Sequence, residues 1–155
     1  MPCNAATIKQ AISVSTEDTV EKVIDVLREH QIDAVPVLDK NGKLEGVFST
    51  RILLKNLLPV SVTTGDDILM DIKIGAAPGV AKRLKKVKPL KVSELMLRKM
   101  HIVAPSAPLW EGVNLLVHHG SPILVVEPET GKFIGMMTEQ SVIDELERVQ
   151  DKPEN

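Results

Sequence analysis

Two hydroxyl side chains stand where an apolar segment ends and a helical pattern begins, and hydroxyls at such positions can hold phosphate. Ser49 follows the apolar segment 44–48, and Thr138 follows the segment 133–137. At a helix start, the hydroxyl lies beside free backbone N–H groups and the positive end of the helix dipole, which together favour an anion. Arg51 could also meet a phosphate near the first position. Helix capping explains both hydroxyls without a ligand, so both interpretations stay open.

The other chemically active side chains form no catalytic or metal-binding pattern. His118 and His119 are adjacent, so on a helix they point about 100° apart. No acidic or cysteine ligand stands at a workable spacing from them or from His101. The sequence also lacks a nucleophile elbow, facing carboxylates and a glycine-rich phosphate loop. We therefore predict a protein that is not an enzyme, holds no metal ion and requires no cofactor.

Composition narrows the class of protein further. The 155 residues, 43% of them apolar, can form one compact unit or two very small ones. A formal charge of -2 offers no global attraction for nucleic acid or anionic membranes, and 2% aromatic residues argue against a base-stacking surface. Cys3 lies near a terminus expected to be loose, and no apolar run or basic leader suggests export. We expect a soluble, cytoplasmic protein with no membrane and no sequence-specific nucleic-acid partner.

The chain contains an internal duplication that becomes visible at a shift of 89 residues. The matched identical residues are Val14 and Val103, Leu27 and Leu116, His30 and His119, Val37 and Val126, and Gly46 and Gly135. Each copy predicts the same order of elements, namely a short strand, a helix, a hairpin and a second helix. The identical residues and the predicted elements coincide at the same shift, so a tandem repeat is the best explanation.

In the first copy, Ile12 and Val14 indicate a short strand, and residues 15–18 resemble a capping box that begins a helix. The helix ends at His30, and its buried face carries Val20, Val23, Ile24 and Leu27. Strands are predicted at 34–38 and 44–48, with Pro36 favouring an edge or strand-start position. A helix over 49–58 is then expected, capped by Ser49 and stopped by Pro59.

The second copy repeats this order. A strand at 102–103 precedes a helix that opens at Ser106 or Pro108 and buries Leu109, Val113 and Leu116. Strands at 123–126 and 133–137 form the hairpin, and Thr138 opens the last helix. Residues 150–155 are expected to form a frayed tail.

Residues 59–90, between the copies, carry structural signals rather than linker composition. A turn or helix start is predicted at 65–70, and a helix opens at 78–80 with Val80, Leu84 and Val87 on one face. The remaining positions form a basic patch of Lys82, Arg83, Lys85, Lys86 and Lys88, with Lys91 just beyond. This patch could meet ligand phosphates, nucleic acid or an acidic partner, or it could be a solvated helix face.

The segments AVPVLD at 34–39, GVFS at 46–49 and GMMT at 135–138, with the lead-in KVSELM at 91–96, carry a family resemblance. The chain resembles a tandem pair of cystathionine-β-synthase (CBS) domains, a Bateman module. The resemblance implies an α+β fold of two β-α-β-β-α repeats, over 5–58 and 91–149, packed sheet to sheet with pseudo-twofold symmetry. The helical insert at 59–90 and the tail at 150–155 complete the expected organisation.

The resemblance also implies a function. Members commonly bind AMP, ADP, ATP or S-adenosylmethionine in clefts between the repeats and pass the occupancy to a partner protein. It implies a stand-alone regulatory module that forms a homodimer and acts on a regulated protein that the sequence does not identify. The implied ligand-binding residues are Ile12, Ser13, Ala34, Val35, Pro36, Ser49 and Arg51 in the first copy, and Ile102, Ile123, Leu124, Thr138, Gln140 and Ser141 in the second.

The chain departs from the family pattern at the position that holds the ribose. The pattern places Asp three residues after the Ser or Thr, whereas this chain has Ile52 and Ser141 there. Isoleucine cannot accept hydrogen bonds from a diol, and a neutral hydroxyl accepts them more weakly than a carboxylate. The alternative to a nucleotide-binding module is therefore a ligand-free scaffold for dimerisation or partner docking.

Overall fold

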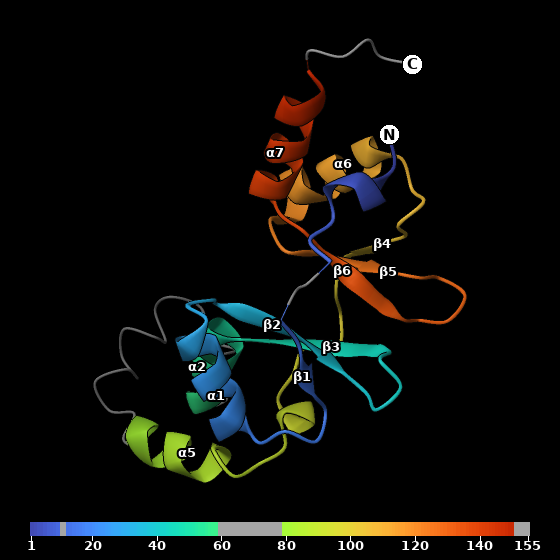
Figure 1. The fold of residues 1–155 in the computed structure, drawn as a ribbon. Helices are drawn as coiled ribbons and strands as arrows, with labels where there is room; N and C mark the ends of the chain where they lie inside the picture. Colours follow the sequence, from blue (N-terminus) through green and yellow to red (C-terminus); the bar gives the residue numbers. More distant parts are fainter. Residues whose placement is uncertain (10–11, 59–78, 151–155) are drawn as a thin grey trace. The chain divides into compact units, whose positions relative to one another are not determined.

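The structure is a computed structural model that describes residues 1–9, 12–58 and 79–150 (Figure 1). It contains two three-stranded sheets with helices, so the predicted α+β class is confirmed. The turn expected at 65–70, the stop at Pro59 and the tail beyond Gln150 lie outside the described residues.

The first sheet has the strand order β1-β2-β3. Its strands are β1 (Val14–Ser15), β2 (Ala34–Leu38) and β3 (Leu44–Ser49). Helix α1 (Val20–Glu29) connects β1 to β2, and α2 (Thr50–Leu57) follows β3. Valine and leucine at three- and four-residue spacing give α1 its buried stripe of Val20, Val23 and Leu27.

The second sheet repeats this arrangement in the order β4-β5-β6. Its strands are β4 (Ile102–Val103), β5 (Ile123–Val126) and β6 (Phe133–Met137), with α6 (Leu109–His119) and α7 (Glu139–Val149) as its helices. Strand β4 runs parallel to β5, and β5 runs antiparallel to β6. Two short 3-10 helices, η1 (Cys3–Ala6) and η3 (Val92–Glu94), precede β1 and β4, and α5 (Val80–Val87) lies in the insert.

Two expectations about the first copy were wrong in detail. Helix α1 is capped by Thr19, whose hydroxyl accepts from the Lys22 N–H at 3.2 Å. The residues before it form a turn because Asp18 accepts from the Ser15 N–H at 2.9 Å. Pro36 lies inside the central strand and not at an edge. Strand β1 has only two residues and therefore forms few hydrogen bonds with β2. Pro36, which has no N–H to donate, is tolerated in β2 for this reason.

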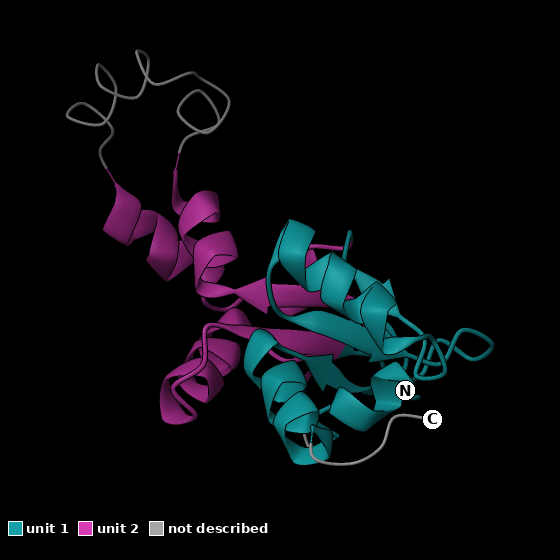
Figure 2. Cartoon of the chain, turned by 90° about the horizontal axis from the view of Figure 1, so that it is seen from above, with its two compact units in different colours: residues 1–13, 38–44, 99–155 teal, residues 14–37, 45–98 magenta. Residues whose placement is uncertain are grey.

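The contacts group the chain into two compact units that do not follow the repeat boundaries (Figure 2). One unit contains residues 1–13, 38–44 and 99–155, and the other contains 14–37 and 45–98. The segment preceding the first strand of each repeat therefore packs with the body of the other repeat. The turn of the first hairpin belongs to the unit of the second repeat. There the backbone of Lys43 forms an antiparallel β-bridge with the backbone of Lys132.

The exchanged lead-in segments make the same backbone contacts 89 residues apart. Cys3 N–H donates to the Ala107 carbonyl at 2.8 Å, as Val92 N–H donates to the Asp18 carbonyl at 2.8 Å. Further along, Ile8 bridges to Met136 and Leu97 bridges to Val47. These pairs extend the duplication upstream into residues 1–8 and 90–97.

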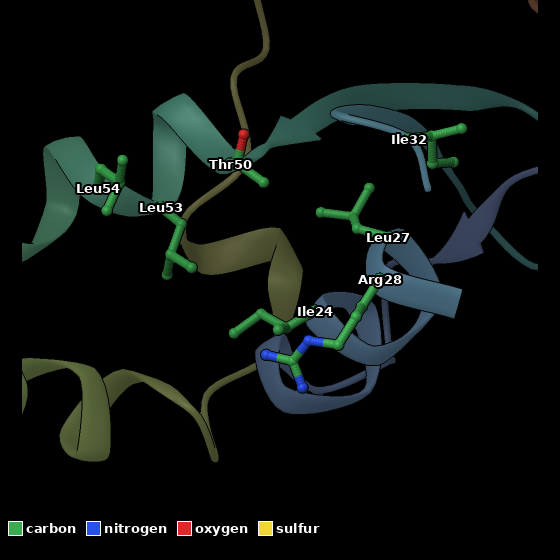
Figure 3. A pocket seen from close by; sticks show the side chains of 7 residues that line it. All are labelled: Ile24, Leu27, Arg28, Ile32, Thr50, Leu53 and Leu54. Carbon is green, nitrogen blue, oxygen red and sulfur yellow. The ribbon is translucent and has the colours of Figure 1, made fainter. Parts of the chain in front are cut away.

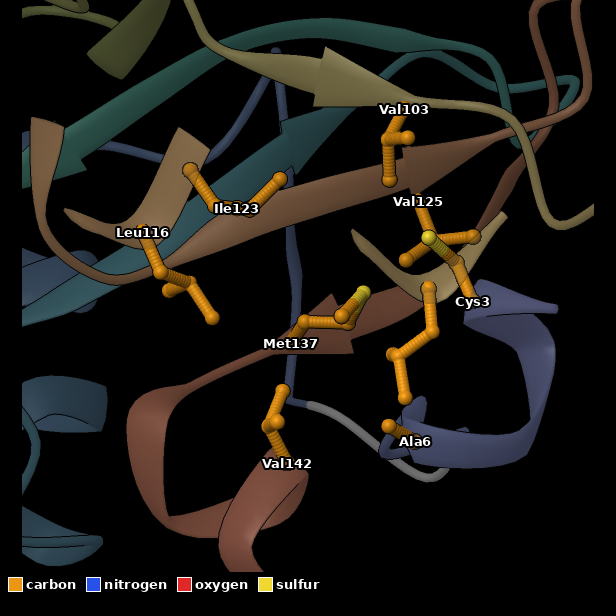
Figure 4. Packing of buried hydrophobic residues seen from close by; sticks show 9 residues of the cluster. Cys3, Ala6, Val103, Leu116, Ile123, Val125, Met137 and Val142 are labelled. Carbon is orange, nitrogen blue, oxygen red and sulfur yellow. The ribbon is translucent and has the colours of Figure 1, made fainter. Parts of the chain in front are cut away.

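The N-terminal segment also completes a hydrophobic core (Figure 4). Cys3 and Ala6 lie in a cluster with Leu116, Ile123 and Met137. The thiol of Cys3 is fully buried, and the loss of hydration raises its pKa above the usual value. The expectation of a loose terminus around Cys3 was therefore wrong, because the terminus supplies side chains that the second repeat needs.

Gly46 on β3 and Gly135 on β6 allow the lead-in segments to approach. A Cβ on Gly46 would lie 2.7 Å from the Met96 sulfur and 2.8 Å from the Leu97 carbonyl oxygen. A Cβ on Gly135 would clash with the Ile8 carbonyl oxygen. Neither glycine has a positive φ, so alanine would suit the local backbone but not the space around it.

We predict that Gly46→Ala and Gly135→Ala each lower the free energy of unfolding, by about 1–3 kcal/mol, because the added methyl displaces a backbone segment. Urea unfolding followed by circular dichroism measures this. The usual effect of Gly→Ala at an unstrained position is a gain of about 0.4–1 kcal/mol. A gain in either variant would contradict the close approach of the lead-in.

Candidate functional site

The start of α2 is the first position where the sequence suggested anion binding. Ser49 caps the helix, and its hydroxyl accepts from the Ile52 N–H at 3.1 Å. The Thr50 N–H donates to the Asp33 carbonyl at 3.0 Å, which places the helix start beside the beginning of β2. The first turn of α2 contains no acidic residue, and Arg51 is exposed within it.

The other candidates of the first copy are divided between the two units. Ala34, Val35 and Pro36 lie on β2, where Val35 and Pro36 are fully buried and contribute to the core. The side chains of Val35 and Pro36 are therefore enclosed by the protein, whereas Ala34 is partly exposed. Ile12 and Ser13 belong to the other unit. The structure thus brings Ser49 and Arg51 close to the residues preceding β2 and groups Ile12 and Ser13 elsewhere.

In the second copy, the sheet register brings the candidates together at one end. Ile102 pairs with Leu124, and Ile123 pairs with Met137, the residue before the helix cap Thr138. Ile123 and Leu124 are buried, whereas Ile102 is half exposed at 51%. Gln140 donates to the Asp144 carboxylate at 2.7 Å, so its amide is engaged along the helix.

The start of α7 satisfies its own polar groups through a capping box. The Ser141 N–H donates to the Thr138 hydroxyl at 3.0 Å, and the Thr138 N–H donates to the Ser141 hydroxyl at 2.9 Å. The Ser141 hydroxyl in turn donates to the Thr138 carbonyl at 3.0 Å. Both hydroxyls are therefore occupied by capping, the ligand-independent role that the sequence left open.

Glu139 adds a negative charge at the same helix start. Its own backbone N–H and the hydroxyl and N–H of Ser121 donate to the carboxylate, which lowers the pKa of Glu139 below the usual value. The side chain is fully exposed to solvent. A carboxylate thus lies where the helix dipole would otherwise attract an external anion. The first repeat has no equivalent group, because Thr50 stands 89 residues earlier.

The structure also brings together histidines that the sequence left apart. The rings of His101 and His119 are stacked, with centroids 3.7 Å apart and planes 10° apart. The His118 ring nitrogen Nδ1 lies 2.8 Å from the Asn114 carbonyl oxygen. No group of three or more potential metal ligands occurs among the residues that the structure describes. Only the fold could reveal this stacking, since His101 precedes β4 and His119 ends α6.

The basic helix α5 forms as the sequence predicted. Leu84 and Val87 are half buried, and the helix packs against α2. Its basic residues are exposed, and Arg83 donates from Nη1 to the Leu58 carbonyl at 2.9 Å. Lys91, beyond the helix, forms an exposed ion pair with Glu17 at 3.0 Å. The helix is thus fixed to the first repeat while it presents cations to solvent.

Comparison with known proteins identifies the fold. The profile of the family described as CBS domain matches residues 5–59 and 92–148. An uncharacterized protein from Methanocaldococcus jannaschii is 26% identical over 151 residues, covering 90% of this chain and 88% of that protein.

Two solved structures are similar to this chain over nearly their whole length. The CBS-pair protein CBSX2 from Arabidopsis thaliana has a TM-score of 0.73 and 21% identity, covering 98% of both chains. A structure of CBSX2 in complex with AMP has a TM-score of 0.68 and 20% identity, covering 96% of this chain and 98% of that one.

Among the described residues, every helix is too short or too polar to cross a bilayer.

We predict that Glu139→Gln lowers the melting temperature at neutral pH but not in acid. A carboxylate whose pKa is lowered by folding stabilises the native state above the unfolded-state pKa of about 4.3. That contribution is lost as the pH falls through the lower pKa of the folded protein. Melting curves of both proteins between pH 7 and pH 2.5 test this, and they should converge at the acidic end.

Glu147→Gln provides the control, because Glu147 is exposed two turns further along α7. It should cause no comparable loss at neutral pH. A pH-independent effect of Glu139→Gln would mean that the hydrogen bonds to its carboxylate do not stabilise the helix start.

Proposed function

The chain belongs to the CBS-domain family, whose domains are regulatory rather than catalytic, and on this basis we propose that it binds an adenine nucleotide through its first repeat. Binding then changes how the module engages a partner protein. The observation that carries the proposal is the difference between the two helix starts. Helix α2 offers a capped N-terminus with Arg51 and no acid, whereas α7 already holds the carboxylate of Glu139.

Phosphate is the part of the ligand that this site favours. The first turn of α2 combines a positive dipole end with the guanidinium of Arg51. Ile52 offers the ribose no acceptor, so phosphate must contribute a larger share of the binding energy. We therefore expect ATP and ADP to bind more tightly than AMP, and AMP more tightly than adenosine. S-adenosylmethionine, whose sulfonium is cationic, should bind most weakly.

The AMP complex of CBSX2 supports the choice of adenine. That protein shares the fold of this chain at 20% identity, so its ligand guides the proposal without transferring individual contacts. The apolar composition of the buried cluster around Cys3, Leu116 and Met137 supports the further proposal that the module folds without a cofactor.

We further propose that the module forms a homodimer through its helices. A groove of about 290 Å³ between α1 and α2 is lined by apolar side chains that include Ile24, Leu53 and Leu54, with Arg28 at its edge (Figure 3). Leu54 is 61% exposed, and Ile143, 89 residues later, is 46% exposed. Both repeats thus leave an apolar residue uncovered at the same helix position, which a self-complementary interface would bury.

We predict that Arg51→Ala weakens ATP binding by roughly tenfold or more, since a charge-assisted hydrogen bond contributes about 1.5–3 kcal/mol. Isothermal titration calorimetry with ATP, ADP, AMP, adenosine and S-adenosylmethionine measures the affinity. Ser49→Ala should also weaken binding, and it should cost roughly 1 kcal/mol of stability through the lost cap.

Thr138→Ala is the matched control because it removes the cap of α7 and should leave ATP affinity unchanged. Equal losses from the two cap variants would count against a site confined to the first repeat. If none of the five ligands binds at millimolar concentration, the ligand-free scaffold becomes the better account.

We predict that Leu54→Glu and Ile143→Glu convert a dimer into a monomer, because each places a charge where an apolar contact is expected. Analytical ultracentrifugation measures the mass. Asn41→Glu, on an exposed turn, adds the same charge and should leave the dimer intact. A monomeric wild-type protein at tens of micromolar would refute the proposed interface.

A further inference from the structure

The unit that contains the groove between α1 and α2 also contains a second cavity, with an apolar floor and a cationic rim. It has a volume of about 380 Å³ and lies between α2, α5 and the segment that follows η3. Ile52, Leu95 and Met96 contribute apolar surface, and Lys55, Asn56 and Arg83 contribute polar groups. The volume falls within the range of roughly 300–1,000 Å³ that is typical of small-molecule sites.

The charge of the cavity has one sign. Lys55 and Arg83 are cations, and the described residues that line the cavity include no carboxylate. The ion pairs of the described part of the chain involve neither of them. Two cations beside an apolar surface favour an anion, because the negative charge would be attracted to both.

Arg83 is held in position before any ligand arrives. Its Nη1 donates to the Leu58 carbonyl at 2.9 Å, which ties helix α5 to the end of α2. Among the described residues, no other acceptor bonds to this guanidinium, so its remaining donors can reach a second acceptor. Asn56 uses one N–H on the Ile52 carbonyl at 2.8 Å, and within the described ranges its second N–H has no partner. Arg83 and Asn56 therefore lose little conformational freedom on binding.

The second repeat does not carry this feature. Positions 89 residues after Lys55 and Asn56 hold Asp144 and Glu145, which are acidic. Arg83 comes from the insert, which occurs once in the chain, between the repeats. The cationic cavity is therefore a property of the first repeat with its insert helix and not of the repeated fold.

We propose that this cavity binds a small amphiphilic anion. The carboxylate or phosphate head lies against Arg83 and Lys55, and the apolar body lies on Ile52, Leu95 and Met96. This gives Ile52 a role, because an acidic residue at that position would place a carboxylate in the anion site. Its anion contacts differ from those of the proposed nucleotide phosphate site, which depends on Arg51 and Ser49, although Ile52 stands at the edge of both sites.

Titration calorimetry of the full chain tests the proposal with two probes, decanoate and decyl phosphate, kept below their micelle concentrations. They share the apolar chain and differ in the head, so they identify which anion is preferred. Acetate and inorganic phosphate supply the heads alone, and decyltrimethylammonium supplies a chain of the same length with a cationic head. We expect at least one anionic probe to bind, with each head alone and the cationic probe at least tenfold weaker.

Arg83→Gln should weaken the bound probe roughly tenfold or more, because it removes a charge-assisted contact. Lys82→Gln removes a neighbouring cation that does not line the cavity, and it should leave affinity unchanged. Ile52→Asp should also weaken the anionic probes, by placing a like charge beside them. Circular dichroism of each variant confirms that it is folded.

Several outcomes would overturn the proposal. These are no binding of either anionic probe at millimolar concentration, equal binding of decyltrimethylammonium, or equal losses in Arg83→Gln and Lys82→Gln. The nucleotide proposal is tested independently, because Arg51→Ala should leave decanoate and decyl phosphate affinities unchanged.

Discussion

The close approach of each lead-in segment to a glycine-bearing strand is the contact on which the rest of the structure depends. Gly46 and Gly135 have no side chain, so the backbones at Leu97 and Ile8 can pair with β3 and β6. This pairing carries Cys3 and Ala6 into the core of one unit and Val92 and Met96 into the interior of the other. Each repeat therefore completes its packing with residues that precede the first strand of the other repeat, and neither stretch 5–58 nor 91–149 contains a whole unit.

The duplicated framework supports two different helix starts. Both helices after the hairpins are capped by a hydroxyl, and the cap bonds have nearly the same length, at 3.1 Å and 3.0 Å. The residues around the caps differ, since α7 begins with Glu139 and α2 begins with Thr50 and Arg51. Helix capping stabilises both copies, whereas the charge near the cap is free to vary. The two repeats can thus keep one fold and differ in their attraction for anions.

The insert helix extends this difference between the repeats. Leu84 and Val87 attach α5 to the first repeat, and Arg83 bonds to the end of α2. The second repeat has acidic residues, Asp144 and Glu145, at the positions that match Lys55 and Asn56 of the first repeat. Positive charge is therefore concentrated in the insert, although the whole chain, with a net charge of -2, is nearly neutral. The net charge does not reveal this concentration, because the cations are grouped in the insert and the acidic residues are dispersed along the chain.

Local patterns predicted the elements well. The valine and leucine spacing of α1, the caps Ser49 and Thr138 and the hairpin turns all depend on interactions between residues close in sequence. The placement of Pro36 was wrong because strand order decides whether a proline lies at an edge. The predicted start of α1 was wrong because the Asp18 carboxylate accepts from the Ser15 N–H, so residues 15–18 form a turn that precedes the helix.

The sequence by itself determined the duplication, the order of elements and the two hydroxyl caps, because each follows from periodicity or local hydrogen bonding. Only the tertiary structure decided that the lead-ins are exchanged and that Cys3 is buried. It alone joined Arg83 and Lys55, 28 residues apart, at one cavity rim. Such contacts depend on how segments distant in the chain pack, and no local pattern specifies that packing.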